Sequence, residues 1–408
     1  MKKQEIVQAA FKVWGQQFFR KTSLSQLSDE LNVTKPALYK HFRNKEALND
    51  AMFLDFFDRL ADFITPYYNE ALGAKDAKKS MLLVSRSFID YFIRNPNDFM
   101  FLIVEVHGNE KYNANMTEQL SLRCIDLKHS AFKITNEYPQ MLQLIIATCF
   151  CMIASFHSKA FREKLQYGDG DIVQYSNLIV TQIEKGLQFN SGLIDALDWA
   201  GIEKKVESHR TESSLSGTHA KILKSIIAAV AQAGPWNTSM TMIAETLGLS
   251  KSSLYSHFTN KLDILKQIFM SITEDIVKRA ASFVEFSQVP EEQLYFAFMG
   301  IISYLKKRPE ILIMMDWIRV RSNDFEKDFA KKHVPDCDSV HDETIKTIHT
   351  IFNGIKKNND VLLSDIQTDC ILFLIVNVLM RRPGETNFCD IKQESFRRLY
   401  RFIALGLE

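Results

Sequence analysis

The sequence is poor in glycine and proline, with 15 and 9 residues in a chain of 408. This composition excludes a low-complexity chain and argues against a loop-rich all-β protein. Neither sign of charge dominates, because 50 basic residues face 49 acidic ones and leave a net charge of +1. The overall charge therefore indicates neither nucleic acid nor membrane as a partner, and any electrostatic footprint must be local.

Cysteine is scarce as well, and none of the six cysteines forms a C-x-x-C pair. The sequence therefore predicts reduced thiols and a cytoplasmic protein rather than disulfides or a zinc site. The most apolar stretches, 141–156 and 371–380, are shorter than the roughly 20 residues of a membrane span, so we expect no membrane partner. Phosphate-binding, serine-hydrolase and zinc-protease motifs are missing too. We expect no enzyme, no cofactor, no metal and no catalytic residues.

Helical periodicity is what the sequence has instead. Near the N-terminus, Ile6, Ala10 and Val13 recur at the spacing of one helix face. Long amphipathic runs follow at residues 45–64, 76–94, 116–138, 140–166 and 169–189. Alternation with a period of two is scarce, so the sequence predicts an all-α fold class.

The chain also repeats itself. Residues 22–48 read TSLSQLSDELNVTKPALYKHFRNKEAL, and residues 238–264 read TSMTMIAETLGLSKSSLYSHFTNKLDI, at a constant offset of 216. Further along, YFIRNP from Tyr91 is echoed by YLKKRP from Tyr304. We therefore expect two tandem repeats that cover both halves of the chain. The polar segment 190–217 between them has the composition of a linker.

The repeated segment has the layout of a helix-turn-helix. Ser23 is placed to cap a first helix, whose core face carries Leu24 and Leu27. Asn32 then interrupts the first copy and Gly248 the second, and both residue types tolerate the left-handed backbone of a tight turn.

A second short helix follows the turn. Thr34 and Ser250 are placed to cap it, and Leu38 and Phe42 bury its inner side in the first copy. Its outer side carries lysine, tyrosine and histidine, which suit a DNA major groove flanked by phosphates.

These residues carry a specific resemblance. TKPALYKHFRNKEAL and SKSSLYSHFTNKLDI resemble the recognition helix and following turn of the TetR family of bacterial transcriptional regulators, with the L-Y-x-H-F-x-N-K core intact twice. The resemblance implies a three-helix DNA-binding head, a connecting helix, and a helical effector domain whose last two helices pair with another subunit. It also implies a small, often apolar effector whose binding releases DNA. No motif identifies the effector-binding residues.

On this basis we expect five parts in the chain. They are an N-terminal helix-turn-helix DNA-binding domain (1–48), a helical effector and dimerisation domain (49–189), a linker (190–217), a second helix-turn-helix domain (218–264) and a second helical effector and dimerisation domain (265–408). The expected partners are double-stranded DNA and an unknown small-molecule effector. Because both copies share one chain, pairing within the chain as a pseudo-dimer is expected over a homodimer.

The resemblance also implies roles for individual residues. Positions that meet phosphates in the family are matched here by Tyr39, His41 and Lys45, and in the second copy by Tyr255, His257 and Lys261. Base-facing or groove-facing positions are matched in the first copy by Ser25, Lys35, Pro36, Ala37 and Lys40. Their counterparts in the second copy are Thr241, Lys251, Ser252, Ser253 and Ser256.

Local charge favours the first head. Residues 1–48 hold nine basic and four acidic side chains, a net +5, whereas residues 216–264 hold four and two, a net +2. Phosphate neutralisation supplies much of the affinity of DNA-binding proteins, so the first head should bind DNA more tightly. One alternative is a ligand- or protein-binding module in which one or both heads no longer bind DNA. A second, weaker alternative is an all-helical enzyme that uses the effector cavity.

Overall fold

The computed structural model describes residues 3–16, 24–106, 116–132, 138–162, 166–208, 225–227, 239–255, 261–307, 311, 350–355, 367, 370–372, 374–375 and 393–407. Every regular element in these ranges is a helix, which confirms the all-α fold class. The chain folds into two compact units, Met1–Glu184 with Leu407, and Lys185–Gly406 with Glu408. Each unit contains one copy of the repeated segment.

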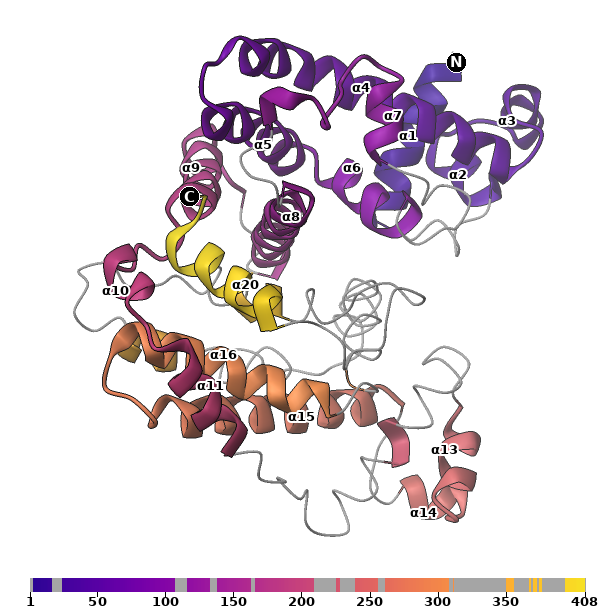
Figure 1. Ribbon diagram of the computed structural model, residues 1–408. Coiled ribbons are helices and arrows are strands. Elements are labelled where there is room, and N and C mark those ends of the chain that lie inside the picture. Colours follow the sequence, from indigo (N-terminus) through magenta and orange to yellow (C-terminus); the bar gives the residue numbers. More distant parts are fainter. Residues whose placement is uncertain are drawn as a thin grey trace. The chain divides into compact units, whose positions relative to one another are not determined.

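The first unit opens with a small group of three helices, the first of which packs on the second and on a long fourth one (Figure 1). These are α1 (Lys3–Gln16), α2 (Leu24–Glu30), α3 (Lys35–His41) and α4 (Lys45–Gly73). In α1, the predicted face is buried at Ile6, Ala10 and Val13. The long helix begins at a cap, because the side chain of Asn44 accepts a hydrogen bond from the Ala47 N–H at 2.8 Å.

The body of the first unit is built on α4 and the helices after it. They are α5 (Ala77–Arg94), α6 (Pro96–Phe101), the π-helix η2 (Leu102–Val106), α7 (Met116–Ser121), the 3₁₀ turn η3 (Ser130–Phe132), α8 (Tyr138–Arg162) and α9 (Asp169–Lys185). Its core is rich in aromatic rings, among them Phe56, Phe92 and Phe99, all nearly fully buried.

One predicted helical run is interrupted in the structure. Among the described residues of the amphipathic run at 116–138, α7 ends at Ser121, Cys124 takes a left-handed φ of 65°, and a 3₁₀ turn follows at 130–132. The Tyr68 hydroxyl fixes the chain beyond this point, because it accepts from the Asp126 N–H at 3.1 Å. Tyr68 lies on α4, 58 residues before Asp126 in the sequence. The periodicity of the run itself cannot predict so distant a partner.

Beside shorter helical pieces such as 225–227 and 350–355, seven helices of the second unit have described bounds. They are α10 (Ser191–Asp195), α11 (Trp199–Ser208), α13 (Met240–Thr246), α14 (Lys251–Tyr255), α15 (Lys261–Val284), α16 (Pro290–Lys306) and α20 (Gln393–Leu405). The helices α15 and α16 pack closely at Gly300, where an added Cβ would lie 2.9 Å from the Arg279 carbonyl oxygen. Only glycine allows the backbones to approach this closely.

The structure differs from the expected linker at 190–217. Residues 191–208 form α10 and α11, and Trp199 packs edge-on against Tyr295 and Tyr400 at ring-centroid distances of 5.0 and 5.6 Å. An ion pair joins Glu203 to Arg397 at 2.5 Å. This part of the segment therefore belongs to the second unit, while residues 209–217 lie outside the described ones. Polar composition alone did not indicate the burial of Trp199's neighbours Ile202 and Val206.

One segment among the described residues, Gln140–His157 in α8, is long and apolar enough to cross a membrane. Half of this segment is buried inside the protein, and a core helix of a soluble protein has the same length and composition.

Candidate nucleic-acid interface

The turn between the first two repeated helices is built in the same way in both copies. The Val33 N–H donates to the Ser28 carbonyl at 2.9 Å, and the Leu249 N–H donates to the Ala244 carbonyl at 2.8 Å. Asn32 and Gly248 donate to the carbonyls of Asp29 and Glu245 at 3.1 and 3.0 Å. This pattern of six-to-one and shorter bonds is the usual way in which a helix ends in a left-handed residue. The predicted helix-turn-helix layout is thus present twice.

Side-chain caps hold the short helix that follows each turn. The Thr34 Oγ1 accepts from the Ala37 N–H at 3.4 Å, and the Ser250 Oγ accepts from the Ser253 N–H at 3.1 Å. The cap predicted for Ser23 lies outside the described residues. Its counterpart Ser239 caps α13 by accepting from the Met242 N–H at 3.2 Å.

Leu38 and Phe42 anchor α3 by its inner side. Both are almost fully buried, as the sequence predicted, and the Phe42 N–H donates to the Leu38 carbonyl at 3.1 Å where the helix ends. Lys3 at the start of α1 places its ammonium 5.4 Å from the centre of the Phe42 ring. Anchoring one side of the helix leaves the opposite side turned to solvent.

The outer side of α3 carries the predicted DNA-binding residues of the first copy. Tyr39 is 49% exposed although it is a large aromatic residue. The other exposed members are Thr34, Lys35, Pro36, Ala37, Lys40 and His41. Ser25 on α2 and Lys45 at the start of α4 are half-buried at the edges of this surface. We call these residues, with Tyr39, the α3 surface.

The second copy shows the same arrangement over a shorter range. Tyr255 is 44% exposed on α14, at the position that matches Tyr39. Thr241, Ser250, Lys251 and Ser252 are exposed as well, and Ser253 is half-buried. Ser256 and His257 lie outside the described residues, and Lys261 is described only as the first residue of α15.

The structure adds one cation that the sequence motif did not assign to the site. Arg43 is exposed between Phe42, where α3 ends, and Asn44, which caps α4. Its position next to the α3 surface makes it a further candidate for a phosphate contact. The one variable position between the motif's phenylalanine and asparagine could have pointed to it.

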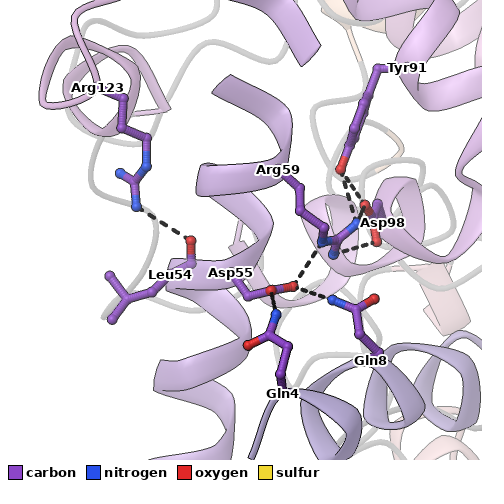
Figure 2. Close-up of polar contacts among 8 residues, drawn as sticks. All are labelled: Gln4, Gln8, Leu54, Asp55, Arg59, Tyr91, Asp98 and Arg123. Carbon is purple, nitrogen blue, oxygen red and sulfur yellow. Dashed lines mark hydrogen bonds and ion pairs between the residues drawn. The ribbon is translucent and has the colours of Figure 1, made fainter. Parts of the chain in front are cut away.

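A polar network ties the first head to the body of its unit (Figure 2). On α1, the amides of Gln4 and Gln8 donate to Asp55, with Gln8 at 2.8 Å. Asp55 on α4 also accepts from Arg59 Nε at 2.8 Å. Arg59 in turn binds Asp98 on α6 through both terminal nitrogens, one of them at 3.1 Å. A continuous chain of hydrogen bonds therefore runs from α1 to α6.

Tyr91 on α5 closes this network. Its hydroxyl donates to Asp98 Oδ2 at 2.5 Å and accepts from Arg59 Nη1 at 3.2 Å. Burial and then the charge of Asp98 raise the pKa of Tyr91, so its phenol remains protonated. Burial opposes the charged form of Arg59, but the hydrogen bond and charge of Asp98 outweigh it and raise the pKa of Arg59 overall. The buried Asp98 carboxylate is thus satisfied by two partners from two helices.

An apolar pocket lies directly beside the network. It encloses about 600 Å³ of empty space including its mouth, between α5, α6, α7, η3 and α8. Phe92 and Phe99 line it and are the chain neighbours of Tyr91 and Asp98. Among the described lining residues none is charged, and Ser85 supplies the one hydroxyl. The sequence alone assigned no residues to an effector site, because the lining comes from five separate elements.

The described residues contain no group of three or more His, Cys, Asp or Glu side chains that could hold a metal ion. The described cysteines are free thiols. Cys149 and Cys151 are both buried, and Cys149 lines the apolar pocket.

The family model described as "Bacterial regulatory proteins, tetR family" matches this chain twice, at residues 6–52 and 222–268. Both matches contain the helix-turn-helix described above and keep the offset of 216. A relative from Bacillus subtilis (strain 168), the uncharacterized HTH-type transcriptional regulator YobS, is 27% identical over 106 residues. The match covers 25% of this chain and 51% of the relative, so the chain spans about half the length of the curated relative it matches.

Two solved structures are similar to about half of the chain. The TetR family transcriptional regulator PfmR from Thermus thermophilus is 20% identical, with a TM-score of 0.36, over 48% of this chain and 99% of that chain. The transcriptional regulator FadR from Bacillus subtilis, solved in complex with stearoyl-CoA, is 15% identical, with a TM-score of 0.37, over 47% of this chain and 100% of that chain.

Proposed function

We propose that this chain of two tandem TetR-like repeats is a sequence-specific DNA-binding transcriptional regulator that acts as a ligand-responsive repressor. The observation that carries the proposal is the α3 surface. A capped helix anchored by Leu38 and Phe42 presents Tyr39, Lys40 and His41 to solvent, and such a helix fits a major groove between phosphates. The same frame occurs again at α14.

The apolar pocket supports the ligand response. A pocket lined by phenylalanine, isoleucine and methionine, with a single hydroxyl, fits a small uncharged molecule. The network from Asp98 to Gln4 gives a physical route from this pocket to the head. A ligand that binds one arrangement of α6 more tightly than another shifts the equilibrium toward that arrangement, and the network passes the change on to the head. The difference between the two affinities sets the size of the shift. We propose that ligand binding releases the DNA. We also propose that the protein is cytoplasmic.

We further propose that the two repeats pair within one chain. The first unit ends at Glu184 and the second begins at Lys185, the last residue of α9, so the chain passes from one unit to the other without an intervening linker. Within that unit, Leu187 and Phe189 donate from their N–H groups to the carbonyls of Ile403 and Ala404 at 2.8 and 3.1 Å. The end of α20 is thereby held to the segment that follows α9. A short tether gives a high effective concentration and favours pairing within the chain.

Selection of binding sites from random DNA by the full chain tests the regulator function. We expect an asymmetric site, because Lys40 can donate to guanine whereas the serines of the second head discriminate bases weakly. The half under the first head should carry more information, with a cost of about 1–3 kcal/mol for each mismatch. A perfect palindrome with equal information in both halves would contradict pairing within the chain. Light scattering then gives the mass, which we expect to be that of one chain.

A second candidate function is favoured by the low charge of the second head, a net +2. In this alternative the chain is a ligand- or protein-binding module whose heads no longer bind DNA. The selection experiment separates the two. A module that does not bind DNA enriches no sequence. In that case the wild-type chain and a variant with both Tyr39 and Lys40 replaced by alanine give the same selection result.

A further inference from the structure

The two repeats place different charges at one matched position. Arg59 on α4 corresponds to Asp275 on α15, because the offset of 216 continues from the head through these helices. Tyr91 corresponds to Tyr304, because α5 begins at Ala77 and α16 at Pro290, which keeps the offset of 213 seen in the sequence. The structure supports this match, since the Tyr304 hydroxyl donates to Asp275 Oδ2 at 3.0 Å.

The tyrosine is thus retained while its charged partners change. Asp98 corresponds by the same offset to Ile311, which is buried and carries no charge. An aspartate at 275 cannot form the ion pair that Arg59 forms with Asp98. The residues that link the head to the body in the first repeat are therefore matched by chemically different residues in the second.

The head side of the network changes as well. Asp55, which accepts from the two glutamines of α1, corresponds to Ser271. The glutamines correspond in the sequence to Ala220 and Lys224. In the first repeat, the Asp55 carboxylate accepts from two amides and a guanidinium. The matched residues of the second repeat supply neither the carboxylate nor these donors.

The pocket differs in the same direction. Ser85 on α5 lines the apolar pocket of the first unit and corresponds to Phe298 on α16. The Phe298 side chain is fully buried, and its ring centre lies 6.3 Å from that of Phe352 and 6.1 Å from that of Tyr400. A phenyl ring therefore occupies the matched position that the first repeat leaves to a small hydroxyl.

Resting on the function proposed above, we infer that the two repeats divide the work between them. The first repeat binds an uncharged apolar ligand and transmits its presence to the first head through Asp98 and Arg59. The second repeat is a fixed partner, in which the Phe298 ring takes the place of Ser85 and the altered network leaves the head independent of the ligand. A ligand then changes the DNA affinity of the first head and leaves the DNA affinity of the second head unchanged.

Binding of Nile red, an uncharged dye that fluoresces in apolar pockets, tests the first half of this inference. The full-length wild-type chain should bind the dye, and Ser85→Phe, which copies the second repeat, should weaken binding at least tenfold. Ser85→Leu serves if the phenylalanine variant does not fold. The matched control Phe298→Ser in the second repeat should retain the wild-type site. Absence of dye binding to the wild-type chain, or loss of binding in Phe298→Ser alone, would overturn the inference.

Hydrogen–deuterium exchange with saturating Nile red tests the second half. Exchange in α1 and α3 should change at least twofold, while residues 239–255 should not respond. Asp98→Asn should bind the dye but lose the response in α1, a result that a merely structural role would not give. Asp275→Asn is the control and should leave the response intact. Equal responses in both heads, or a full response in Asp98→Asn, would overturn the inference. Because no DNA is present, this outcome is independent of whether the heads bind DNA.

Discussion

Asn32 and Gly248 adopt the same left-handed backbone conformation, with φ of 52° and 65°, at matched positions of the two heads. An added Cβ at Gly248 meets no atom within 4 Å, so the requirement at this position is conformational rather than steric. Left-handed backbone costs an ordinary residue about 1–2 kcal/mol, whereas glycine and asparagine adopt it more readily.

Gly248→Ala should therefore destabilise its unit by about 1 kcal/mol and lower its Tm by about 2–4 °C. Gly248→Asn is the matched control, because the first head uses asparagine at this position, and it should lose less. Differential scanning calorimetry of the full chain measures both. An alanine variant as stable as the asparagine variant would contradict the explanation.

Lys45→Ala should weaken DNA binding and make its salt dependence shallower by about one unit of the slope. Lys45 is the first residue of α4, half-buried at the edge of the α3 surface, where its charge can replace condensed counterions. Fluorescence anisotropy with the selected DNA at several salt concentrations measures the slope. Lys128→Ala, an exposed lysine of the same unit outside the head, should leave it unchanged. If the Lys45 variant keeps the wild-type slope, the edge of the α3 surface does not lie against the phosphates.

Trp199→Ala should lower the stability of the second unit by about 2 kcal/mol or more. The indole packs against Tyr295 and Tyr400, and the Arg397 guanidinium lies 5.2 Å from its ring. Leu193→Ala is the control, since Leu193 on α10 is exposed. Calorimetry should show a lower Tm for the tryptophan variant alone. Equal effects of the two variants would mean that α11 behaves as part of a linker after all.

The first unit should lose stability as the pH falls below about 6.5, the ordinary pKa of histidine. Burial, partly opposed by the hydrogen bond from Nε2 to the Phe92 carbonyl at 2.9 Å, lowers the pKa of His157. The unfolded chain therefore takes up a proton more readily than the folded one. The stabilisation is complete above the unfolded pKa and is lost as the pH falls through it toward the folded pKa.

His157→Gln tests this assignment, because its amide can still donate to the Phe92 carbonyl but does not titrate. Its Tm should fall less than that of the wild type between pH 7.5 and pH 5. If Tm falls equally with pH in the two proteins, the pH dependence arises from groups other than His157.

The sequence by itself determined the helix-turn-helix heads. Their caps, turn residues and buried faces depend on partners within a few positions along the chain, so the local pattern is enough to assign Thr34, Asn32 and Leu38. The duplication was equally visible, because a constant offset needs no knowledge of packing.

Only the tertiary structure decided how the bodies are built. The ion pair of Arg59 with Asp98 joins residues that are 39 apart in the sequence. The bond between Glu203 on α11 and Arg397 on α20 joins residues that are 194 apart. The apolar pocket likewise draws on five elements, each of which shows ordinary core periodicity. Such contacts depend on which helix faces meet after folding, and amphipathic patterns identify a buried face without identifying its partner.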